Sequence, residues 1–465
     1  MFVKIVCTIG PASEKYETLR AMAEAGMNVA RFNFSHGDYE QHGRNLGLVR
    51  SLERDRGIPI AALLDTKGPE IRTGEVENGA VELKAGSHVL LTPEECLGTP
   101  ERVHVKYPKF AEEIKPGQSV YIDDGEIYME AEESGPGGVM CRVIAGGRLE
   151  NTKGINVPGA ALSMPALSDR DVQDIKWGAE RGMEFLAMSF VKTGGDVERA
   201  RGLLNALGSE MRIAAKIETR EAVANIEDVV DASDGVMVAR GDLGVEIPTE
   251  DVPLVQKHII ALCRARGKFV IVATQMLDSM IRSPRPTRAE ATDVANAVLD
   301  GADAVMLSGE SASGLYPVQA VATMRRIADR AERELGRWGL PCRENMEIAG
   351  VPDAVSDAAV LISKEMGAAA IVSITQSGFT ARMVSKHRPS CPILGVTSSE
   401  RTWRDMAMLW GVTPVMSDRS GLSPRDAVSI CKAAGLLKDG DTAVVTAGFP
   451  VGTVGSTNTI EVVMA

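Results

Sequence analysis

The sequence predicts an α/β fold: a (β/α)8 TIM barrel with an inserted small β-barrel lid domain and a C-terminal doubly wound α/β domain. Short apolar strands alternate with helical patterns through most of the first 337 residues, which is typical of a parallel barrel. The alternation is interrupted once by alternating strands with Pro-Gly and Gly-Gly turns, which indicates an insertion. It restarts after residue 338, and this restart predicts the third domain.

The barrel is expected to have eight strands. They are expected at residues 3–9, 28–32, 60–64, 185–188, 212–215, 235–238, 269–272 and 303–307. Helical patterns occupy residues 14–24, 171–180, 196–207, 220–230, 251–266, 286–300 and 316–334. Short strands are expected in the insertion at residues 80–93, 117–133 and 138–144. The last alternation covers residues 354–366, 370–375, 380–387, 393–397, 402–410, 426–434 and 442–447.

We expect the barrel to comprise residues 1–69 and 155–337, the lid residues 70–154, and the last domain residues 338–465. Gly68-Pro69 and Pro158-Gly159 bracket the insertion as hinges, so the lid is expected to close over the carboxyl ends of the barrel strands. A static cap is the alternative.

Composition excludes several partners. A formal charge of −12 over 465 residues disfavours nucleic acids and anionic membranes, which require an extended basic face. The seven cysteines form no CxxC pair and are expected to be buried, reduced thiols. Residues 1–6 open directly into a strand pattern, and no apolar run approaches membrane-spanning length, so we expect a cytoplasmic protein. A small anion remains a suitable ligand, through local cations at Arg31, Lys67, Arg72, Lys153, Lys216 and Arg240.

Three segments at predicted strand ends carry chemistry: residues 215–218, 239–244 and 273–276. In a barrel, residues just beyond the strands share one pocket, so Glu218 and Asp242 are candidate Mg²⁺ ligands. Two carboxylates with substrate oxygens and water satisfy this ion. Alternatively, Glu218 caps the helix that follows and Asp242 only turns the chain.

Lys216 is placed to hold its ammonium group against a moving phosphoryl group or a developing enolate. Gly241 allows backbone amides to approach a carboxylate closely, and Thr274 adds a hydroxyl from the next strand. The alternative for Lys216 is a strand-end lysine that reaches solvent or pairs with Glu218. Taken together, the segments indicate a phosphoryl-transfer enzyme.

Residues 28–37 place Arg31, Asn33 and Ser35 on one side of an extended segment. Asp65 and Thr66 follow at the next strand end. Four residues therefore offer oxygen ligands, and we expect them to form an all-oxygen site for a monovalent cation: Asn33, Ser35, Asp65 and Thr66. A polar network that satisfies itself is the alternative.

The chain resembles pyruvate kinases from its first strand to its last loop. The matching segments are residues 4–13, 28–37, 64–74, 216–218, 236–246, 273–281, 284–290 and 306–310. The resemblance implies transfer of the phosphoryl group of phosphoenolpyruvate to ADP, followed by protonation of the enolate to pyruvate. It further implies a cytoplasmic glycolytic enzyme and a homotetramer.

The resemblance assigns roles to the barrel residues. Glu218 and Asp242 would hold Mg²⁺ or Mn²⁺, Lys216 would stabilise the phosphoryl group in flight and the enolate oxygen, and Arg31 would contact the substrate phosphate. The amides of Gly241 and Asp242 would bind the substrate carboxylate together with the hydroxyl of Thr274. The proton path would include Thr274, Ser308 and Glu310.

Nucleotide and potassium sites follow from the same resemblance. The positions that match nucleotide contacts are Asn33, Phe34, Ser35, His36, Arg72, Lys153 and, reaching the nucleotide-bound metal, Asp124. The positions that match potassium ligands are Asn33, Ser35, Asp65 and Thr66. Glu70 is the residue type of potassium-dependent members, so activation by K⁺ is expected.

The third domain resembles the effector domain of the family at residues 373–382. Its hydroxyls and amides at a helix N-terminus suit a phosphate, and the candidate contacts are Thr375, Ser377, Gly378 and Thr380. An ordinary capped strand-turn-helix junction is the alternative. The final loop, residues 447–459, contains no lysine or arginine, unlike members that clamp fructose 1,6-bisphosphate with an arginine there. A sugar monophosphate or nucleoside monophosphate is therefore the expected effector.

Two other functions are compatible with parts of the pattern. A carbon–carbon lyase barrel that handles enolpyruvate or oxaloacetate would use Glu218 and Asp242 similarly, but it would not need the lid. A catalytically silent sugar-phosphate sensor would use only the third domain, and the presence of Lys216, Arg31 and Thr274 disfavours it.

Overall fold

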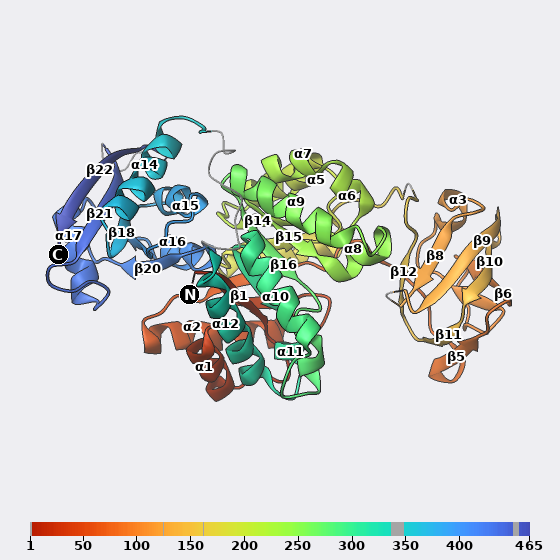
Figure 1. Cartoon of the computed structure of the whole chain (residues 1–465). Coiled ribbons are helices and arrows are strands. Elements are labelled where there is room, and N and C mark those ends of the chain that lie inside the picture. Colours follow the sequence, from red (N-terminus) through yellow and green to blue (C-terminus); the bar gives the residue numbers. More distant parts are fainter. Residues whose placement is uncertain (1, 124, 161, 336–347, 450–454) are drawn as a thin grey trace.

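Eight parallel strands close into a barrel at the centre of the molecule (Figure 1). The computed structural model describes residues 2–123, 125–160, 162–335, 348–449 and 455–465. The barrel order is β1-β17-β16-β15-β14-β13-β3-β2. The strands are β1 (Lys4–Thr8), β2 (Val29–Asn33), β3 (Ala61–Asp65), β13 (Phe185–Met188), β14 (Arg212–Ile217), β15 (Gly235–Ala239), β16 (Phe269–Ala273) and β17 (Ala304–Leu307). All eight coincide with predicted strands.

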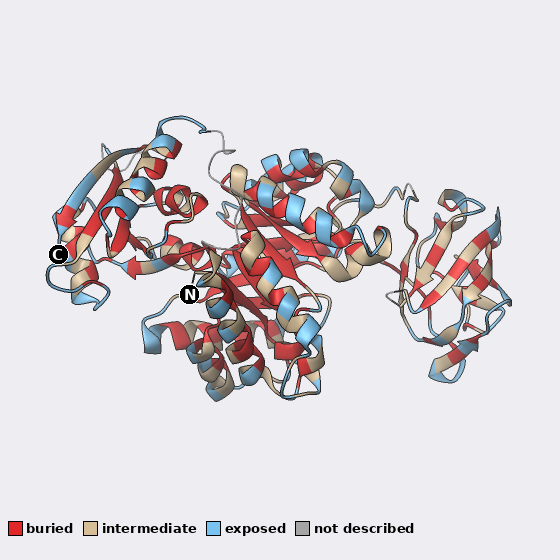
Figure 2. Cartoon of the chain, in the orientation of Figure 1, coloured by how far each residue is buried: buried red, intermediate tan, exposed pale blue. Residues whose placement is uncertain are grey.

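The barrel strands are nearly continuous apolar runs because both of their faces are covered (Figure 2). Inside the barrel, the rings of Phe185 and Phe269 meet edge to face with centroids 5.5 Å apart. Gly235 makes this packing feasible, since a Cβ there would lie 2.4 Å from the Phe269 ring. The interior is thus a packed core, and the chemistry is confined to the strand ends.

Helices surround the barrel. They are α1 (Tyr16–Ala25), α2 (Tyr39–Arg56), α4 (Asp169–Glu180), α5 (Gly194–Ala206), α6 (Arg220–Ala224), α7 (Ile226–Ala232), α8 (Arg240–Glu246), α9 (Val252–Ala265), α10 (Arg288–Asp300), α11 (Gly309–Ala312) and α12 (Pro317–Glu332), with a 3₁₀ turn η2 (Asp278–Ile281). Sequence analysis did not identify α2, whose apolar positions are few. The Asp38 side chain starts α2 by accepting from Gln41 N at 2.8 Å, and left-handed Gly57 ends it. The predicted helix 220–230 is broken at Asn225 into α6 and α7.

The insertion forms a separate β module joined to the barrel by two chain segments (Figure 1). Its main sheet has the order β4-β12-β8-β9-β10-β6-β7, and β11 pairs with β5. The elements are β4 (Ile71–Arg72), η1 (Glu77–Gly79), β5 (Ala80–Leu83), β6 (His88–Thr92), β7 (Arg102–His104), α3 (Phe110–Glu113), β8 (Ser119–Ile122), β9 (Ile127–Gly135), β10 (Gly138–Ala145), β11 (Gly147–Glu150) and β12 (Gly154–Asn156). The module has its own apolar core, separate from that of the barrel.

The third domain is a five-stranded sheet of order β20-β19-β18-β21-β22, with helices around it and only β22 antiparallel to its neighbour. Its elements are α14 (Val351–Glu365), β18 (Ala370–Ile374), α15 (Phe379–Lys386), β19 (Ile393–Thr397), α16 (Glu400–Asp405), η4 (Met406–Met408), β20 (Val412–Met416), α17 (Pro424–Ala433), β21 (Thr442–Gly448) and β22 (Thr457–Met464). The predicted helix 402–410 is shorter and ends in the η4 turn.

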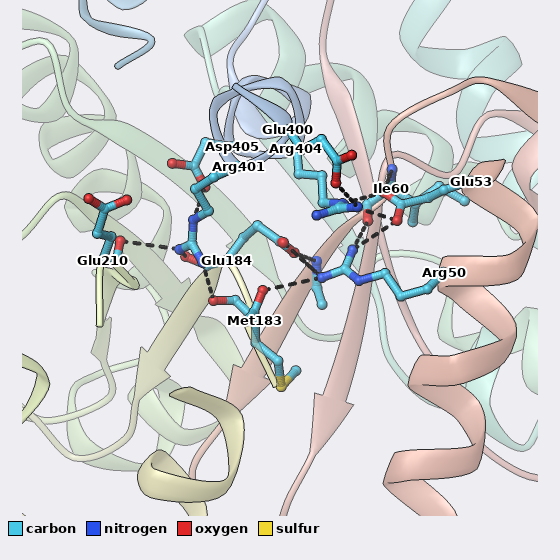
Figure 3. Close-up of polar contacts among 12 residues, drawn as sticks. Arg50, Glu53, Ile60, Met183, Glu184, Glu210, Glu400, Arg401, Arg404 and Asp405 are labelled. Atoms are coloured by element: carbon cyan, nitrogen blue, oxygen red, sulfur yellow. Dashed lines mark hydrogen bonds and ion pairs between the residues drawn. The ribbon is translucent and has the colours of Figure 1, made fainter. Parts of the chain in front are cut away.

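Helix α16 joins the third domain to the amino ends of the barrel strands (Figure 3). Arg401 donates to the backbone carbonyls of Met183 and Glu184, at 2.7 and 2.8 Å, and to that of Glu210 at 3.2 Å. These carbonyls precede β13 and β14. The η4 turn continues the contact, because Ala407 and Met408 join the apolar cluster inside the barrel.

Two buried carboxylates join the same region to the outer helix α2. Arg404 donates to both oxygens of Glu53 at 3.1 Å, and Arg50 donates to both oxygens of Glu184 at 2.7 and 2.8 Å (Figure 3). The Glu184 side chain is fully buried, so its charge depends on this pairing. Among the described residues, no helix combines the length and apolar character needed to cross a membrane.

Candidate active site

Polar side chains gather where the barrel strands end, on the face opposite α16. A deep open cavity of about 1280 Å³ lies beside this face, between the barrel and the β module. The predicted residues at the strand ends are Arg31, Asn33, Asp65, Thr66, Lys216, Glu218, Gly241, Asp242, Thr274, Ser308 and Glu310. The structure brings several of them into direct contact.

Lys216 is the centre of this cluster. Its Nζ donates to Asp65 Oδ1 at 3.0 Å and to Ser189 Oγ at 2.7 Å, and lies 2.7 Å from Glu218 Oε1. Burial alone would lower the pKa of Lys216, but the carboxylates of Asp65 and Glu218 outweigh burial and hold the pKa above its usual value. Lys216 is therefore a permanently charged ammonium group in a nearly water-free position.

Asp65 holds a second buried cation. Its Oδ2 accepts from Arg31 Nε at 2.7 Å, while Arg31 also donates to Thr8 Oγ1 at 2.8 Å. Burial acts to raise the pKa of Asp65, yet Arg31 and Lys216 together hold it below the usual value. One carboxylate thus orients two cations toward the same strand ends.

The alternative role for Glu218, capping the helix that follows it, is not what the structure shows. That helix, α6, is capped by Thr219, which accepts from Ala222 N at 3.1 Å. The second oxygen of Glu218 instead accepts from Phe190 N at 2.6 Å. The Glu218 carboxylate therefore lies in the site, beside Lys216.

Asp242 lies in the first turn of α8, after the strand that neighbours Lys216's strand, and its charge influences the pKa of Lys216. The described residues contain no group of three His, Cys, Asp or Glu side chains arranged around a metal position. Two carboxylates at adjacent strand ends nevertheless fit Mg²⁺ or Mn²⁺, because such ions in phosphoryl-transfer sites take one or two carboxylates and fill the remainder with substrate oxygens and water.

Gly241 and Thr274 are in direct contact. Gly241 N donates to Thr274 Oγ1 at 2.8 Å, and the hydroxyl donates to Ala273 O at 2.6 Å. Thr274 and Gln275 both have left-handed backbones, with φ of 68° and 52°. A β-branched residue rarely adopts this conformation, so the turn is held by its surroundings.

Glu310 braces two loops. Its oxygens accept from Leu277 N at 3.0 Å and Ser308 N at 2.8 Å. Burial raises the pKa of Glu310, although these backbone donors act in the opposite direction. Glu310 thereby fixes the segments that follow β16 and β17.

The residues predicted to bind a monovalent cation mostly form hydrogen bonds with one another or with neighbouring groups. This is the self-satisfied polar network that the sequence analysis gave as the alternative. Asn33 Oδ1 accepts from Ser35 N at 3.1 Å, and Thr66 Oγ1 accepts from Ser189 N at 3.1 Å. Both Asp65 oxygens are held by Arg31 and Lys216. Glu70, beyond β3, accepts from Arg72 Nε at 2.6 Å.

The predicted nucleotide residues divide into two groups. Arg72 and Lys153 line the cavity, and Lys153 Nζ lies 2.7 Å from Asp123 Oδ2. Phe34 is buried, and its ring stacks on that of His42 with the two centroids 4.3 Å apart. His36 is exposed, and its carbonyl lies 2.9 Å from His42 Nε2. Asp124 lies outside the described residues.

Two residues were missed by sequence analysis. Ser189 is 1% exposed and uses one hydroxyl to accept from Lys216 and donate to Thr66 O at 2.6 Å. Lys192 lines the cavity beside the barrel. Ser189 directly follows the predicted strand 185–188 and Lys192 lies three residues further on, so polar residues at a barrel strand end were the available signal.

The effector candidates lie where β18 meets α15. Gly378 has φ of 78° at the start of α15, and Thr380 Oγ1 bonds Thr457 Oγ1 at 2.8 Å. Thr375 is buried. The carbonyl of Ser377 accepts from Arg212 Nη2 at 2.8 Å, and Arg212 is the first residue of β14. Residues 450–454 of the final loop lie outside the described residues.

Comparisons with known proteins agree with this architecture. Residues 2–321 match the family model of the pyruvate kinase barrel domain, and residues 353–463 match that of the pyruvate kinase alpha/beta domain. The pyruvate kinase of Geobacillus stearothermophilus is 49% identical over 99% of this chain and 79% of the relative. The pyruvate kinase of Clostridium acetobutylicum is 44% identical over 99% of this chain and 98% of the relative. The crystal structure of a pyruvate kinase from Cryptosporidium parvum superposes with a TM-score of 0.90 at 37% identity, covering 100% of this chain and 96% of the other.

We expect Asp65→Asn to destabilise the protein by about 3 to 5 kcal/mol at pH 7, because Arg31 and Lys216 lose their shared buried counterion. The folded pKa of Asp65 lies below its unfolded value of about 3.9, so the unfolded state binds the proton first as the pH falls. The stability that Asp65 contributes is therefore present above about pH 4 and lost below it. Urea unfolding from pH 7 to 3 should show the gap between parent and variant narrowing at acid pH; a constant gap would contradict this assignment.

Proposed function

Since the chain belongs to the pyruvate kinase family, whose reaction transfers a phosphoryl group between phosphoenolpyruvate and ADP, we propose that this transfer takes place at the carboxyl ends of its barrel strands. The observation that carries the proposal is the buried cluster in which Asp65 aligns Arg31 and Lys216. Phosphoryl transfer is catalysed chiefly by positioning and by positive charge placed where negative charge develops.

Lys216 stabilises the phosphoryl group in flight and then the enolate oxygen, and Arg31 holds the substrate phosphate. In the structure Lys216 has three oxygen neighbours, from Asp65, Ser189 and Glu218. An incoming phosphoryl oxygen replaces the Glu218 carboxylate beside Lys216, because Glu218 is then needed as a ligand of the divalent cation. Lys216 thus stays protonated and positioned throughout.

Glu218 and Asp242 hold the divalent cation, Mg²⁺ or Mn²⁺. When bound, the ion supplies Lewis-acid stabilisation of the substrate and enolate oxygens. Phe190 N keeps Glu218 turned toward this position through the oxygen that Lys216 does not contact. The chemistry of the two carboxylates, hard oxygen donors at adjacent strand ends, supports the assignment.

The amides of Gly241 and Asp242, with the hydroxyl of Thr274, bind the substrate carboxylate. The existing bond between Gly241 N and Thr274 Oγ1 places both donors beside each other. Thr274, Ser308 and Glu310 form the path by which a proton reaches the enolate carbon.

ADP binds at the open cavity between barrel and β module, where Arg72 and Lys153 line it, and extends to residues 33–36 outside the cavity lining. The nucleotide contacts assigned are Asn33, Phe34, Ser35, His36, Arg72, Lys153 and Asp124. Lys192, which also lines the cavity, adds a cation there. A potassium ion bound by Asn33, Ser35, Asp65 and Thr66 would replace part of the local hydrogen-bond network.

The domains assigned are residues 1–69 with 155–337, residues 70–154, and residues 338–465. Gly68 and Gly159, with φ of 74° and 75°, lie at the two connections and act as hinges of the lid. A Cβ on Gly68 would lie 2.6 Å from the Phe190 ring, so only glycine fits there. The protein acts in the cytoplasm as a homotetramer.

A phosphorylated effector regulates the enzyme through the third domain, at Thr375, Ser377, Gly378 and Thr380. The contact between the Ser377 carbonyl and Arg212 supports this coupling, because β14 begins at Arg212 and ends beside Lys216. A displaced Ser377 would therefore act on the strand that carries the catalytic lysine.

We expect Lys216→Met to lower kcat by at least about 10³-fold while leaving the fold intact, since it removes charge stabilisation of the transition state. The measurement is the steady-state formation of pyruvate from phosphoenolpyruvate, ADP and Mg²⁺ with K⁺. The matched control is Lys257→Met, which removes a surface lysine paired with Asp300. Comparable activity of the two variants would contradict the role of Lys216.

We expect K⁺ to activate the parent enzyme and Glu70→Lys to weaken this activation, because a fixed ammonium group would replace the mobile cation. Rates are compared in potassium and in tetramethylammonium buffers free of sodium and potassium. Equal parent rates in both buffers would refute a potassium site.

We expect a sugar monophosphate or nucleoside monophosphate to lower the phosphoenolpyruvate concentration that gives half-maximal rate, and Thr380→Val to abolish this effect without changing the basal rate. Strong activation by fructose 1,6-bisphosphate alone would overturn the proposed effector class. Titration of each compound at subsaturating phosphoenolpyruvate makes the comparison.

A further inference from the structure

The turn at Thr274 and Gln275 needs an external support. Two consecutive non-glycine residues with φ of 68° and 52° are strained, and the first of them is β-branched. Such a backbone persists only where neighbouring groups hold it. The group that contacts both sides of Thr274 is the guanidinium of Arg240.

Arg240 binds the two carbonyls that bracket this residue. Its Nη2 donates to Thr274 O at 2.7 Å and its Nε donates to Ala273 O at 3.3 Å. The guanidinium is planar and offers its N–H groups in a fixed fork, so both carbonyls are oriented by one rigid group. A lysine in this position would have a single donor centre and could not span them in the same way.

Arg240 is itself held from the opposite side. Its Nη1 donates to Asp293 Oδ1 of α10 at 2.6 Å, and its side chain is 12% exposed. The charge of Arg240 is therefore paired and turned toward the protein. Sequence analysis counted Arg240 among the cations available to a small anion, and the structure instead directs it to the backbone.

The hydroxyl of Thr274 must change partners when substrate binds. It now donates to Ala273 O and accepts from Gly241 N, whereas the proposed function has it donate to the substrate carboxylate together with Gly241 N. Ala273 is fully buried, so its carbonyl would lose a partner that water cannot replace. Arg240 Nε remains bonded to that carbonyl after the hydroxyl turns away.

We propose that Arg240 is a positioning residue for the phosphoryl-transfer reaction: it holds the left-handed turn at Thr274 and keeps the Ala273 carbonyl satisfied while the Thr274 hydroxyl turns to the substrate. Asp293 anchors the guanidinium in this orientation. The inference rests on the proposed role of Thr274 in binding the substrate carboxylate.

The test is a double-mutant cycle with Arg240→Lys and Thr274→Val, measured as kcat and as KM for each substrate. Arg240→Lys is expected to lower kcat/KM for phosphoenolpyruvate about 100-fold and to leave KM for ADP within about twofold. In the Thr274→Val background, Arg240→Lys should cost less than about threefold, since its effect passes through the missing hydroxyl. Thermal unfolding of each variant reports the folded fraction.

Asp293→Asn and Asp300→Asn, both on α10, form the matched pair. Asp293 contacts Arg240, whereas Asp300 pairs with the exposed Lys257. We expect Asp293→Asn to reproduce part of the loss in kcat/KM for phosphoenolpyruvate and Asp300→Asn to leave it unchanged. Additive effects in the cycle, or equal behaviour of the two aspartate variants, would overturn the inference. Absence of turnover in the folded parent would instead refute the proposed function.

Discussion

The site depends on one buried carboxylate shared by two cations. Asp65 at the end of β3 binds Arg31 from β2 through one oxygen and Lys216 from β14 through the other. Without a counterion the buried ammonium group of Lys216 would lose its proton or leave the site, and the guanidinium of Arg31 would turn away from the site. A single carboxylate between the two cations prevents these outcomes. Ser189 and Glu218 complete the surroundings of Lys216. Two positive charges are therefore fixed at these strand ends, as the proposed site of phosphoryl transfer requires.

The closed barrel is what makes this sharing feasible. Strands β2, β3, β13 and β14 are consecutive neighbours in the barrel, although residues 66–184 separate β3 from β13 in the chain. That interval includes the whole β module, whose separate core lets it be inserted without disturbing the pairing of β3 with β13. The module adds one wall to the cavity beside the strand ends, and Arg72 and Lys153 lie on that wall.

The opposite end of the same strands is joined to the third domain. Arg401 binds the carbonyls of residues that precede β13 and β14, and Arg212 at the start of β14 binds the Ser377 carbonyl. The buried pair of Arg50 and Glu184 lies behind this seam (Figure 3). A close-packed core has little room to absorb a displacement, and this is the physical basis of the proposed coupling between the third domain and the strand ends.

The sequence by itself determined the barrel, its insertion and the third domain, since buried parallel strands are apolar runs and polar residues just beyond them signal the site. It placed Lys216, Glu218 and Asp242 at strand ends. It did not reveal helix α2, because the apolar face of that helix is narrow and the segment is otherwise polar. Only the tertiary structure decided which partner each polar group takes. Ser189 supports Lys216 because β13 lies between β3 and β14 in the barrel, and Arg240 serves the Thr274 backbone because Asp293 faces it from α10. Pairings of this kind join residues far apart in the chain, and the local sequence pattern does not specify which strand ends and helices become neighbours.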